Sequence, residues 1–435
     1  MEWVADLALF FGLLVAMMLS GMPVAFGFIT LNIVGLYLYL GVGSLSLLAT
    51  SSFSSIGQFS LIPIPLFILM GELLLRTGLA GKTVEAVDQW IGRLPGRLSL
   101  SSVGGGTLFG ALSGASMASV AMLGSTLVPE MAKRGYKPEM SVSSILAGGG
   151  LAVLIPPSAL GVLLGALAKV SIAELLLAGI LPGILLASMY FIYFAVRAKL
   201  QPHLAPPYNA PRTTLVHKLY TLLTVSPLLA LIVVVTGFIF LGIATPSESA
   251  AMGVIATLIV AALYGRLTFD ALKKALMSTM TTSSMMLLVI VGSTGFGQLL
   301  AASGATSSLV AWVSALVIAP ILLVIVMQGI VLLLGCFIDT ISIMLISIPV
   351  FMPIIVQLGI DPIWFCILIL VQLELAGITP PFGVLLFVMK GVQQHLKVSE
   401  IYRAALPIVL IQVVLVAILM IFPQIVTKLP ELIRN

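Results

Sequence analysis

Charged residues are scarce in this chain: Asp, Glu, Lys and Arg together make up 8% of its 435 residues. A soluble domain carries about 25% charged residues, because its surface must face water. Hydrophobic residues make up 60% of the chain, and the mean hydropathy is +1.24. The composition therefore excludes an ordinary soluble domain and indicates that most of the surface faces an apolar medium.

Residues that usually carry catalytic chemistry are also few. The two cysteines, Cys336 and Cys366, both fall in apolar runs and suggest neither a disulfide framework nor a metal site. The three histidines, His203, His217 and His395, are scattered through polar segments and lack the spacing of metal ligands. No hydrolytic or redox constellation is visible, so we predict that the chain is not an enzyme and carries no cofactor.

The N-terminus, Met1-Glu2-Trp3, lacks the basic residues that open a cleaved signal peptide, so we expect the first apolar run to be a retained helix. Crossing a hydrocarbon core of about 30 Å takes about 20 residues in a helix. Because the apolar runs are continuous rather than alternating, they predict membrane helices and not a barrel. We therefore predict an all-α polytopic membrane protein. The predicted crossings are residues 3–20, 22–41, 56–76, 139–168, 172–196, 220–243, 246–264, 277–301, 362–391 and 404–427.

Two further apolar stretches, 98–132 and 320–356, carry glycine, serine and proline near their midpoints. They fit re-entrant hairpins, which enter and leave the membrane on the same side. The stretches 79–96 and 304–319 precede them, and the first of these is amphipathic, which suggests a helix lying along the interface. The most polar segment, 197–219, contains four prolines and is interpreted as a linker.

Positive charge is distributed unevenly between the two predicted sides of the membrane. With the N-terminus outside, only three of the 20 Lys and Arg residues, Lys169, Lys428 and Arg434, fall on the outer side. Cytoplasmic loops are enriched in Lys and Arg, so we predict that both termini lie outside and that 197–219 is cytoplasmic. The net charge of +5 then needs no nucleic-acid partner to explain it.

An internal repeat becomes visible when the sequence is shifted against itself by 224 residues. The ungapped matches are Ser116 with Thr340, Pro129 with Pro353, Gly135 with Gly359, Pro138 with Pro362, and Pro156-Pro157 with Pro380-Pro381. We therefore divide the chain into a first repeat, 1–196, and a second repeat, 220–435. Each repeat contains an odd number of predicted crossings, so the second enters the membrane inverted. Inverted repeats of this kind place substrate and ion sites near the midplane, where broken helices meet.

The first hairpin contains the segment ALSGASMASVAMLGS at 111–125, with hydroxyl groups where the chain should reverse. Ser113, Ser116 and Ser119 are candidate ligands of a substrate or an ion. Small residues also permit close helix packing in lipid, and that alternative stays open for each serine. Ser116 is favoured because it coincides with Thr340 of the second hairpin under the repeat.

Asp339 lies beside Thr340 within a long apolar run of the second hairpin. A charged residue at the centre of a bilayer costs at least about 2.5–3.5 kcal/mol on insertion scales. Either backbone donors satisfy this carboxylate, or it is a cation ligand or a proton carrier. Glu374, in the second broken helix, is a similar case, with a packing role as its alternative.

Two Pro-Pro steps interrupt the predicted crossings 139–168 and 362–391. Proline lacks an N–H and pushes the preceding residue out of the helical region, so each step should end one half-helix and begin another. The freed carbonyls can coordinate a cation, and the next helix N-terminus faces an anion. A simple kink is the alternative, but two symmetric breaks opposite hydroxyl-rich hairpins favour a binding site. The candidates at the breaks are Gly149, Gly150, Ile155, Pro156, Pro157, Gly377, Thr379, Pro380 and Pro381.

Several of these segments together resemble the large membrane subunit of tripartite ATP-independent periplasmic (TRAP) transporters, over essentially the whole chain. The segments that carry the resemblance are SGASMASVAMLGS (113–125), KRGY (133–136), IPPS (155–158), GIATPSE (242–248), GCFIDT (335–340), GIDP (359–362) and ITPPFG (378–383). The resemblance implies the ion transporter superfamily, with a scaffold domain and an elevator-type transport domain made of the hairpins and broken helices.

The resemblance also implies an activity and partners. The expected activity is sodium-driven import of an organic acid, such as a dicarboxylate, sialic acid or a similar carboxylate. The expected location is the bacterial inner membrane, with both termini periplasmic. The expected partners are a periplasmic substrate-binding protein and a separate small four-helix membrane subunit.

With sodium as the coupling ion, we predict two unequal sites. Sodium prefers oxygen ligands, and a buried anion beside it offsets part of its desolvation cost. The repeats differ here, because Asp339 aligns with Ala115 under the 224-residue shift. The predicted ligands are Ser116 with carbonyls in 149–155 at the first site, and Asp339 and Thr340 with carbonyls in 377–379 at the second.

Two other functions remain open from the sequence. A stand-alone carrier of the same superfamily would need neither a binding protein nor a small subunit, and a passive channel can also contain hairpins. The inverted repeats and Asp339 favour a coupled transporter over a channel. Saturable uptake that collapses when sodium is removed would distinguish them.

Overall fold

The computed structural model describes residues 2–92, 94–206, 215–315, 318–336, 338–381 and 383–434. Within these ranges all regular secondary structure is helical, which confirms the predicted all-α class. Seven of the described helical segments are long and apolar enough to cross a membrane. Large apolar side chains such as Phe53, Leu263 and Phe269 are 78%, 80% and 83% exposed. Surface of this kind suits lipid and not water, and the chain is a multi-pass membrane protein.

The helices follow one another in two series. The first series is α1 (Glu2–Leu19), α2 (Val24–Leu40), α3 (Gly43–Ile56), η1 (Phe59–Leu61), α4 (Pro63–Arg76), α5 (Leu79–Ile91), α6 (Arg97–Ser113), α7 (Ser116–Lys133), α8 (Pro138–Gly150), η2 (Leu151–Val153), α9 (Ala159–Ala168), α10 (Ile172–Ala178) and α11 (Ile180–Leu200). The second series is α12 (Leu215–Phe240), α13 (Pro246–Leu263), α14 (Phe269–Ala302), α15 (Ala305–Ala315), α16 (Pro320–Gly335), α17 (Thr340–Gln357), α18 (Pro362–Ile378), α19 (Val384–Val392), α20 (Val398–Ile421) and α21 (Gln424–Arg434).

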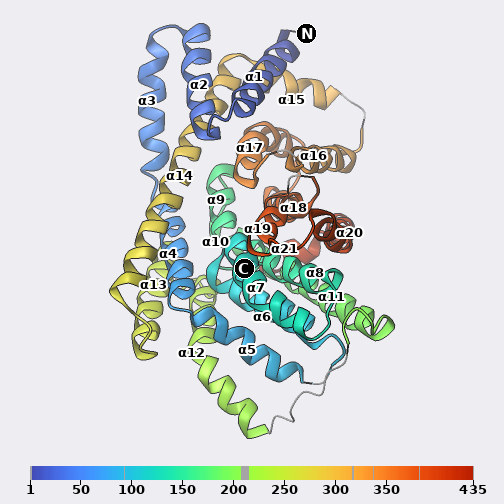
Figure 1. Cartoon of the computed structure of the whole chain (residues 1–435). Helices are drawn as coiled ribbons and strands as arrows, with labels where there is room; N and C mark the ends of the chain where they lie inside the picture. Colours follow the sequence, from blue (N-terminus) through green and yellow to red (C-terminus); the bar gives the residue numbers. More distant parts are fainter. Residues whose placement is uncertain are drawn as a thin grey trace.

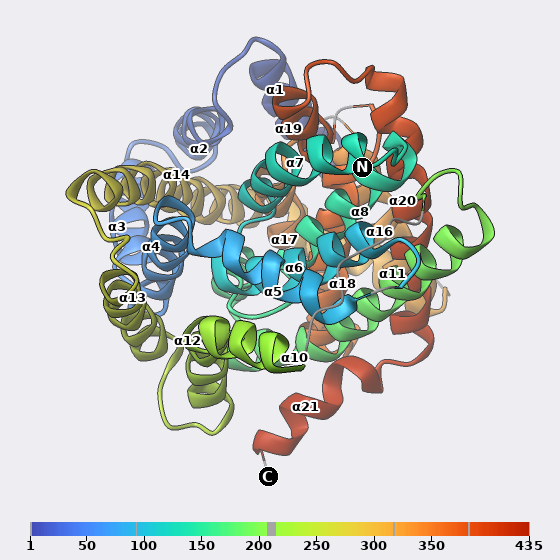
Figure 2. The same cartoon turned by 60° about the horizontal axis from the view of Figure 1, so that its bottom comes forward.

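The helices form two parts that lie side by side (Figure 1). The long helix α14 runs along one edge; α2, α3 and α4 pack against it, and α13 packs against α4. The other part contains the helix pairs α6–α7 and α16–α17 and the interrupted helices α8–α9 and α18–α19. Contacts of α4 with α6 and of α14 with α17 join the two parts. Figure 2 shows the C-terminal helix α21 extending from the body next to α10, which it contacts.

Glycines permit the close packing of α2 against α14. A Cβ on Gly292 would lie 2.9 Å from the Cβ of Phe28, and one on Gly295 would lie 2.6 Å from Nδ2 of Asn32. The buried Asn32 donates through Nδ2 to the carbonyl of Gly292 at 2.8 Å. Phe28 meets Phe296 edge to face, with ring centroids 5.2 Å apart. Small residues therefore let the backbones approach where the two halves of the chain meet.

Both predicted hairpins are helical hairpins, and both predicted Pro-Pro steps interrupt helices. The first hairpin consists of α6 and α7 over 97–133, and the second of α16 and α17 over 320–357. The Pro156-Pro157 step lies between η2 and α9, and the Pro380-Pro381 step lies between α18 and α19. Both of these peptide bonds are cis. Phe337 and Phe382, next to the second tip and the second break, lie outside the described residues.

The helix α3 was not predicted, because its serines and threonine lower its hydropathy. Several of these hydroxyls bond within the helix: Ser51 and Ser54, for example, each donate to a carbonyl three residues earlier. Such back-bonding removes much of the cost of placing a hydroxyl in an apolar setting. The predicted crossing 56–76 starts at the last residue of α3 and consists mainly of η1 and α4.

Several predicted crossings, among them 277–301 and 404–427, differ at their ends from the observed helices. The crossing predicted at 277–301 is α14, which begins at Phe269 because the Thr268 hydroxyl caps it by accepting from the N–H of Ala271 at 3.1 Å. The crossing predicted at 404–427 is α20, which begins at Val398 and ends at Ile421, and α21 follows. Of the predicted linker 197–219, residues 207–214 lie outside the described residues.

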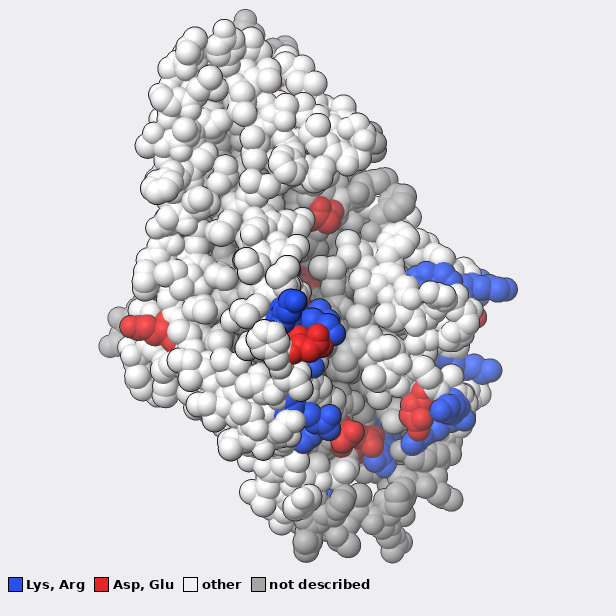
Figure 3. Space-filling view, turned by 60° about the vertical axis from the view of Figure 1, so that its left-hand side comes forward, with Lys and Arg blue, Asp and Glu red and all other residues white. Residues whose placement is uncertain are grey.

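Charge is segregated on the surface. The sequence contains no charged residue between Asp6 and Glu72. Accordingly, the upper part of the face in Figure 3, which α1 to α3 help to form, is almost entirely white, whereas Lys and Arg gather in the lower half. This segregation follows from the uneven spacing of Lys and Arg along the chain.

Candidate functional site

The tip of the first hairpin is held together by its own hydroxyls. After α6 ends at Ser113, Gly114 adopts a left-handed conformation with φ +60°, which glycine tolerates without strain. Ser113 Oγ and Ser119 Oγ lie 3.5 Å apart. Ser119 Oγ donates to the carbonyl of Ala115 at 3.0 Å, and Ser113 Oγ accepts from the Ala115 N–H at 3.4 Å. Two of the three predicted serines thus have local partners in the turn, whereas Ser116 reaches another helix.

The first break packs directly against this tip. A Cβ on Gly114 would lie 3.0 Å from the carbonyl oxygen of Pro157, so the turn touches the Pro-Pro step. A Cβ on Gly149 would lie 2.5 Å from a valine side chain of α7. Beyond the step, the Ser158 hydroxyl caps α9 by accepting from the N–H of Gly161 at 3.1 Å. The predicted residues in or beside this break are Gly149, Gly150, Ile155, Pro156 and Pro157.

A hydrogen bond between the first hairpin and the second broken helix joins the two repeats. Ser116 Oγ donates to Oε2 of Glu374 at 3.0 Å. Glu374 lies within α18 and is only 4% exposed. Its other oxygen, Oε1, has no hydrogen-bond partner among the described residues, and a Cβ on Gly150 would lie 2.4 Å from it. Burying a carboxylate with an unpaired oxygen is costly, so this position is chemically suited to a bound cation or a proton.

Gly150, which lies against Oε1 of Glu374, is the residue that corresponds to Glu374 in the first repeat. The register that matches Ser116 with Thr340 also matches Gly150 with Glu374, since 374 − 150 = 224. Equivalent residues of two inverted repeats meet only near the axis that relates the repeats. A large side chain on one of them therefore requires a small residue on the other. The sequence identified Ser116, Gly150 and Glu374 as separate candidates but did not predict that they meet.

Asp339 caps the second helix of the second hairpin, which begins at Thr340. Its Oδ2 accepts from the N–H groups of Ile341 at 3.1 Å and Ser342 at 3.2 Å, and its Oδ1 accepts from the Ser342 hydroxyl. The residue is half-buried. Backbone donors thus engage this carboxylate, as one of the two alternatives expects. A carboxylate has about four acceptor sites, so the role as a cation ligand stays a prediction.

The second break is closed by hydrogen bonds within its loop and to the helices α18 and α20. The Thr379 hydroxyl donates to the Leu375 carbonyl at 2.6 Å, and the Thr379 carbonyl accepts from the Gly383 N–H at 3.1 Å. The carbonyl of Pro381 accepts from the Tyr402 hydroxyl at 2.5 Å. The predicted residues at this break are Gly377, Thr379, Pro380 and Pro381. Within the described part of the chain, no hydrogen bond joins them to Asp339 or Thr340.

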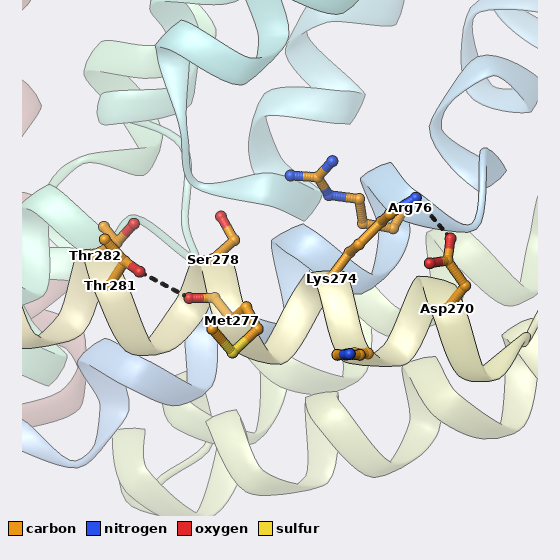
Figure 4. A pocket seen from close by; sticks show the side chains of 8 residues that line it. Arg76, Asp270, Lys274, Met277, Ser278, Thr281 and Thr282 are labelled. Carbon is orange, nitrogen blue, oxygen red and sulfur yellow. Dashed lines mark hydrogen bonds and ion pairs between the residues drawn. The ribbon is translucent and has the colours of Figure 1, made fainter.

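A different polar hollow lies near the start of α14, where Figure 4 shows Arg76 of α4 close to Lys274 and Asp270 of α14. It is an open groove of about 570 Å³. Lys274 pairs with Asp270 at 2.7 Å, and Arg76 pairs with Glu72 at 3.1 Å. None of the predicted site residues lines it. Because no predicted site residue lines this groove and two of its three cations, all but Lys273, pair with acids, we do not regard it as the functional site.

Helical hairpins that pack against interrupted helices, in an all-helical chain with a lipid-facing surface, define a polytopic membrane protein of the transporter class. The family described as "Tripartite ATP-independent periplasmic transporter, DctM component" matches residues 11–425. The chain belongs to this family and is the large membrane subunit of a TRAP transporter.

Known relatives cover nearly the whole chain. The C4-dicarboxylate TRAP transporter large permease protein DctM of Pseudomonas aeruginosa is 32% identical over 387 residues, which are 88% of this chain and 89% of the relative. The isethionate TRAP transporter permease protein DctMQ of Oleidesulfovibrio alaskensis is 29% identical over 427 residues, covering 98% of this chain and 66% of that relative. The crystal structure of the YdaH transporter of Alcanivorax borkumensis matches with a TM-score of 0.62 at 18% identity, over 88% of this chain and 89% of that one. This last likeness shows a shared fold.

Proposed function

We propose that this chain is the transport subunit of a sodium-coupled importer, which takes up a small organic acid by an elevator movement in the bacterial inner membrane. Family membership supports the transport role. Relatives named for C4-dicarboxylates and isethionate support a small carboxylate or sulfonate as the substrate. The scarcity of Lys and Arg on one predicted side supports periplasmic termini.

The observation that carries the ion coupling is the buried carboxylate of Glu374, whose Oε1 lacks a partner among the described residues. A buried anion is tolerated when a counter-charge or further hydrogen bonds compensate it. Sodium would meet this need, with the Ser116 hydroxyl and a carbonyl near Gly149 as further oxygen ligands. The first proposed site thereby gains an acid, and the second keeps Asp339, Thr340 and Thr379.

The two-part architecture supports an elevator movement. We assign α2, α3, α4, α13 and α14 to the scaffold, and the hairpins with the interrupted helices to the moving transport domain. The scaffold exposes apolar side chains such as Phe53 on α3 and Leu263 on α13. A small membrane subunit that packs on such a face would enlarge the scaffold, and a periplasmic binding protein would deliver the substrate.

Uptake into proteoliposomes tests this proposal. The chain is reconstituted with its small subunit and supplied outside with the binding protein loaded with its organic acid. We expect saturable uptake that requires both the binding protein and an inward sodium gradient. Equal uptake with choline in place of sodium would reject the coupling. Non-saturable flux would favour a channel, and full activity of the chain alone would favour a stand-alone carrier.

A further inference from the structure

A cavity of about 920 Å³ lies between α3, α9, α14 and α17. Figure 1 shows α9 and α17 beside α14 in the upper part of the molecule, with α3 at the upper left. Hydroxyl and amide side chains line the cavity, among them Ser51, Ser293, Gln298 and Gln357. None of the residues of the two hairpin tips or Pro-Pro steps lines it. Among the described residues that do, Lys169 carries the one charge.

Lys169 has, through its side chain, no charged or hydrogen-bonded partner among the described residues that would explain its charge. It follows the last turn of α9 in a left-handed conformation, with φ 56°. Its ammonium group is exposed and makes no ion pair or hydrogen bond with the described side chains. The helix dipole gives a cation at an exposed helix C-terminus a small stabilisation. That benefit accounts for a lysine here, but it does not account for the hydroxyl and amide groups that share the cavity wall with apolar side chains.

The predicted topology places the residues that line the cavity toward the outer side of the membrane. Lys169 is one of only three basic residues that the charge distribution places on the outer side. Of the other lining segments, 293–301 lies at the outer end of the predicted crossing 277–301, and 356–357 lies where the predicted hairpin 320–356 leaves the membrane on the outer side. The cavity therefore opens, in the proposed topology, toward the side from which a substrate arrives.

We infer that this cavity is an entry vestibule for the anionic group of a small organic carboxylate or sulfonate. Lys169 is its electrostatic anchor, and the amide N–H groups of Gln298 and Gln357 are hydrogen-bond donors for the same anion. No acid of the described lining competes for the ammonium, in contrast with the groove in Figure 4, where Arg76 and Lys274 each pair with an acid.

The walls of the vestibule come from both parts of the molecule. Helices α3 and α14 belong to the scaffold, and α9 and α17 to the proposed transport domain. A movement of one part past the other would therefore change the volume of the vestibule. This inference rests on the proposed function, because a vestibule for an organic anion has a purpose only in an importer of such anions.

Thiol chemistry tests the vestibule without requiring transport. Ser54, an exposed residue that lines the cavity, is replaced by cysteine in a variant whose Cys336 and Cys366 are alanine. The complex with the small subunit, in nanodiscs, is treated with a sulfonatoethyl or a trimethylammonioethyl methanethiosulfonate. With Lys169 present, the anionic reagent should be favoured, and Lys169→Met should lower the ratio of the two rates roughly fivefold.

The control is Lys428→Met, which removes an exposed lysine of the same predicted side that does not line the cavity. It should leave the ratio unchanged. The inference is overturned if neither reagent reacts, or if the ratio is the same with and without Lys169. An equal decrease in the Lys428→Met control would also overturn it, because the effect would then come from net charge alone.

Uptake supplies the second measurement. Lys169→Met should raise the KM for substrate-loaded binding protein roughly tenfold while keeping the sodium dependence, and Lys169→Arg should restore it. The wild-type KM should rise with added choline chloride at fixed sodium, and the KM of Lys169→Met should not. If the wild type shows no sodium-driven uptake, the proposed function is wrong. The ratio of the two thiol-reaction rates would still test whether the cavity attracts anions. An unchanged KM in an active Lys169→Met variant would refute the vestibule alone.

Discussion

Replacing Gly150 with alanine should strain the contact between the two repeats. The added Cβ would lie 2.4 Å from Oε1 of Glu374, 3.1 Å from its Cδ and 3.2 Å from its Cγ. A carbon and an oxygen are normally no closer than about 3.3 Å, so the carboxylate would have to move by about 1 Å. The end of a glutamate side chain is flexible, but this one is 4% exposed and has little free space. A movement of that size would also lengthen the 3.0 Å hydrogen bond from Ser116.

The expected cost follows from these contacts. Adding a methyl group to a well-packed interior costs about 1–3 kcal/mol, and losing a hydrogen bond to a charged group costs about 1.5–3 kcal/mol. Alanine recovers up to about 1 kcal/mol of helix propensity over glycine, and less here because Gly150 is the last residue of α8. We therefore expect Gly150→Ala to lower the free energy of unfolding by about 2–5 kcal/mol.

The assay is unfolding in mixed micelles titrated with SDS, with uptake measured in parallel. Glu374→Ala removes the group that the new methyl meets, so it should recover stability in the Gly150→Ala background. The double-mutant cycle should then give a coupling energy of at least about 1 kcal/mol. Gly81→Ala in α5, where a Cβ meets nothing within 4 Å, is the control. Additive effects of the two substitutions would refute this reasoning, as would an undiminished stability of Gly150→Ala.

Three further changes have defined outcomes. Asp339→Asn keeps an N-cap acceptor but removes the charge, so the variant should fold while its apparent sodium affinity in uptake falls at least about tenfold; an unchanged sodium dependence would leave Asp339 with a capping role only. Gly335→Ala should lower the free energy of unfolding by more than about 2 kcal/mol, because its Cβ would lie 2.1 Å from a Cβ of α18, whereas Gly329→Ala on the same helix meets open space and should cost nothing. A cysteine at Gln201, in a variant without the native cysteines, should resist an impermeant thiol reagent in intact cells and react after lysis, and labelling in intact cells would reverse the proposed topology.

The hairpins could be predicted from the sequence because strong local signals mark them. Glycine, serine and proline interrupt apolar runs at 98–132 and 320–356, and the observed helices reverse there. The helix α3 could not be predicted in this way, because hydropathy counts a serine as polar even when its hydroxyl bonds to its own helix. The N-terminal beginning of α14 was also missed, because hydropathy does not detect a helix cap. The Thr268 cap starts the helix in a polar segment that contains charged residues.

The sequence predicted individual residues of the candidate site, but it did not predict which of them contact one another. Periodicity and composition identify Ser116 and Glu374 as polar groups in apolar surroundings. They do not indicate that a residue of the first hairpin bonds to the second broken helix, 258 positions away. The signal that could have found this contact is the match of Gly150 with Glu374 in the 224-residue register. A glycine matched with a glutamate is the pattern expected where equivalent residues of the two repeats meet near the axis that relates them.

Exact symmetry cannot hold at such an axis. Two glutamates at positions 150 and 374 would overlap and repel each other, and two glycines would leave no acid at the contact. One Gly and one Glu resolve this conflict, and the acid then belongs to one repeat only. Asp339 also has no acidic counterpart in the first repeat, because it matches Ala115. Both buried or half-buried acids of the site therefore come from the second repeat, while the first supplies the Ser116 hydroxyl and the space at Gly150. It follows that substitutions in the second repeat should change ion coupling through charge, and those in the first should change it through geometry.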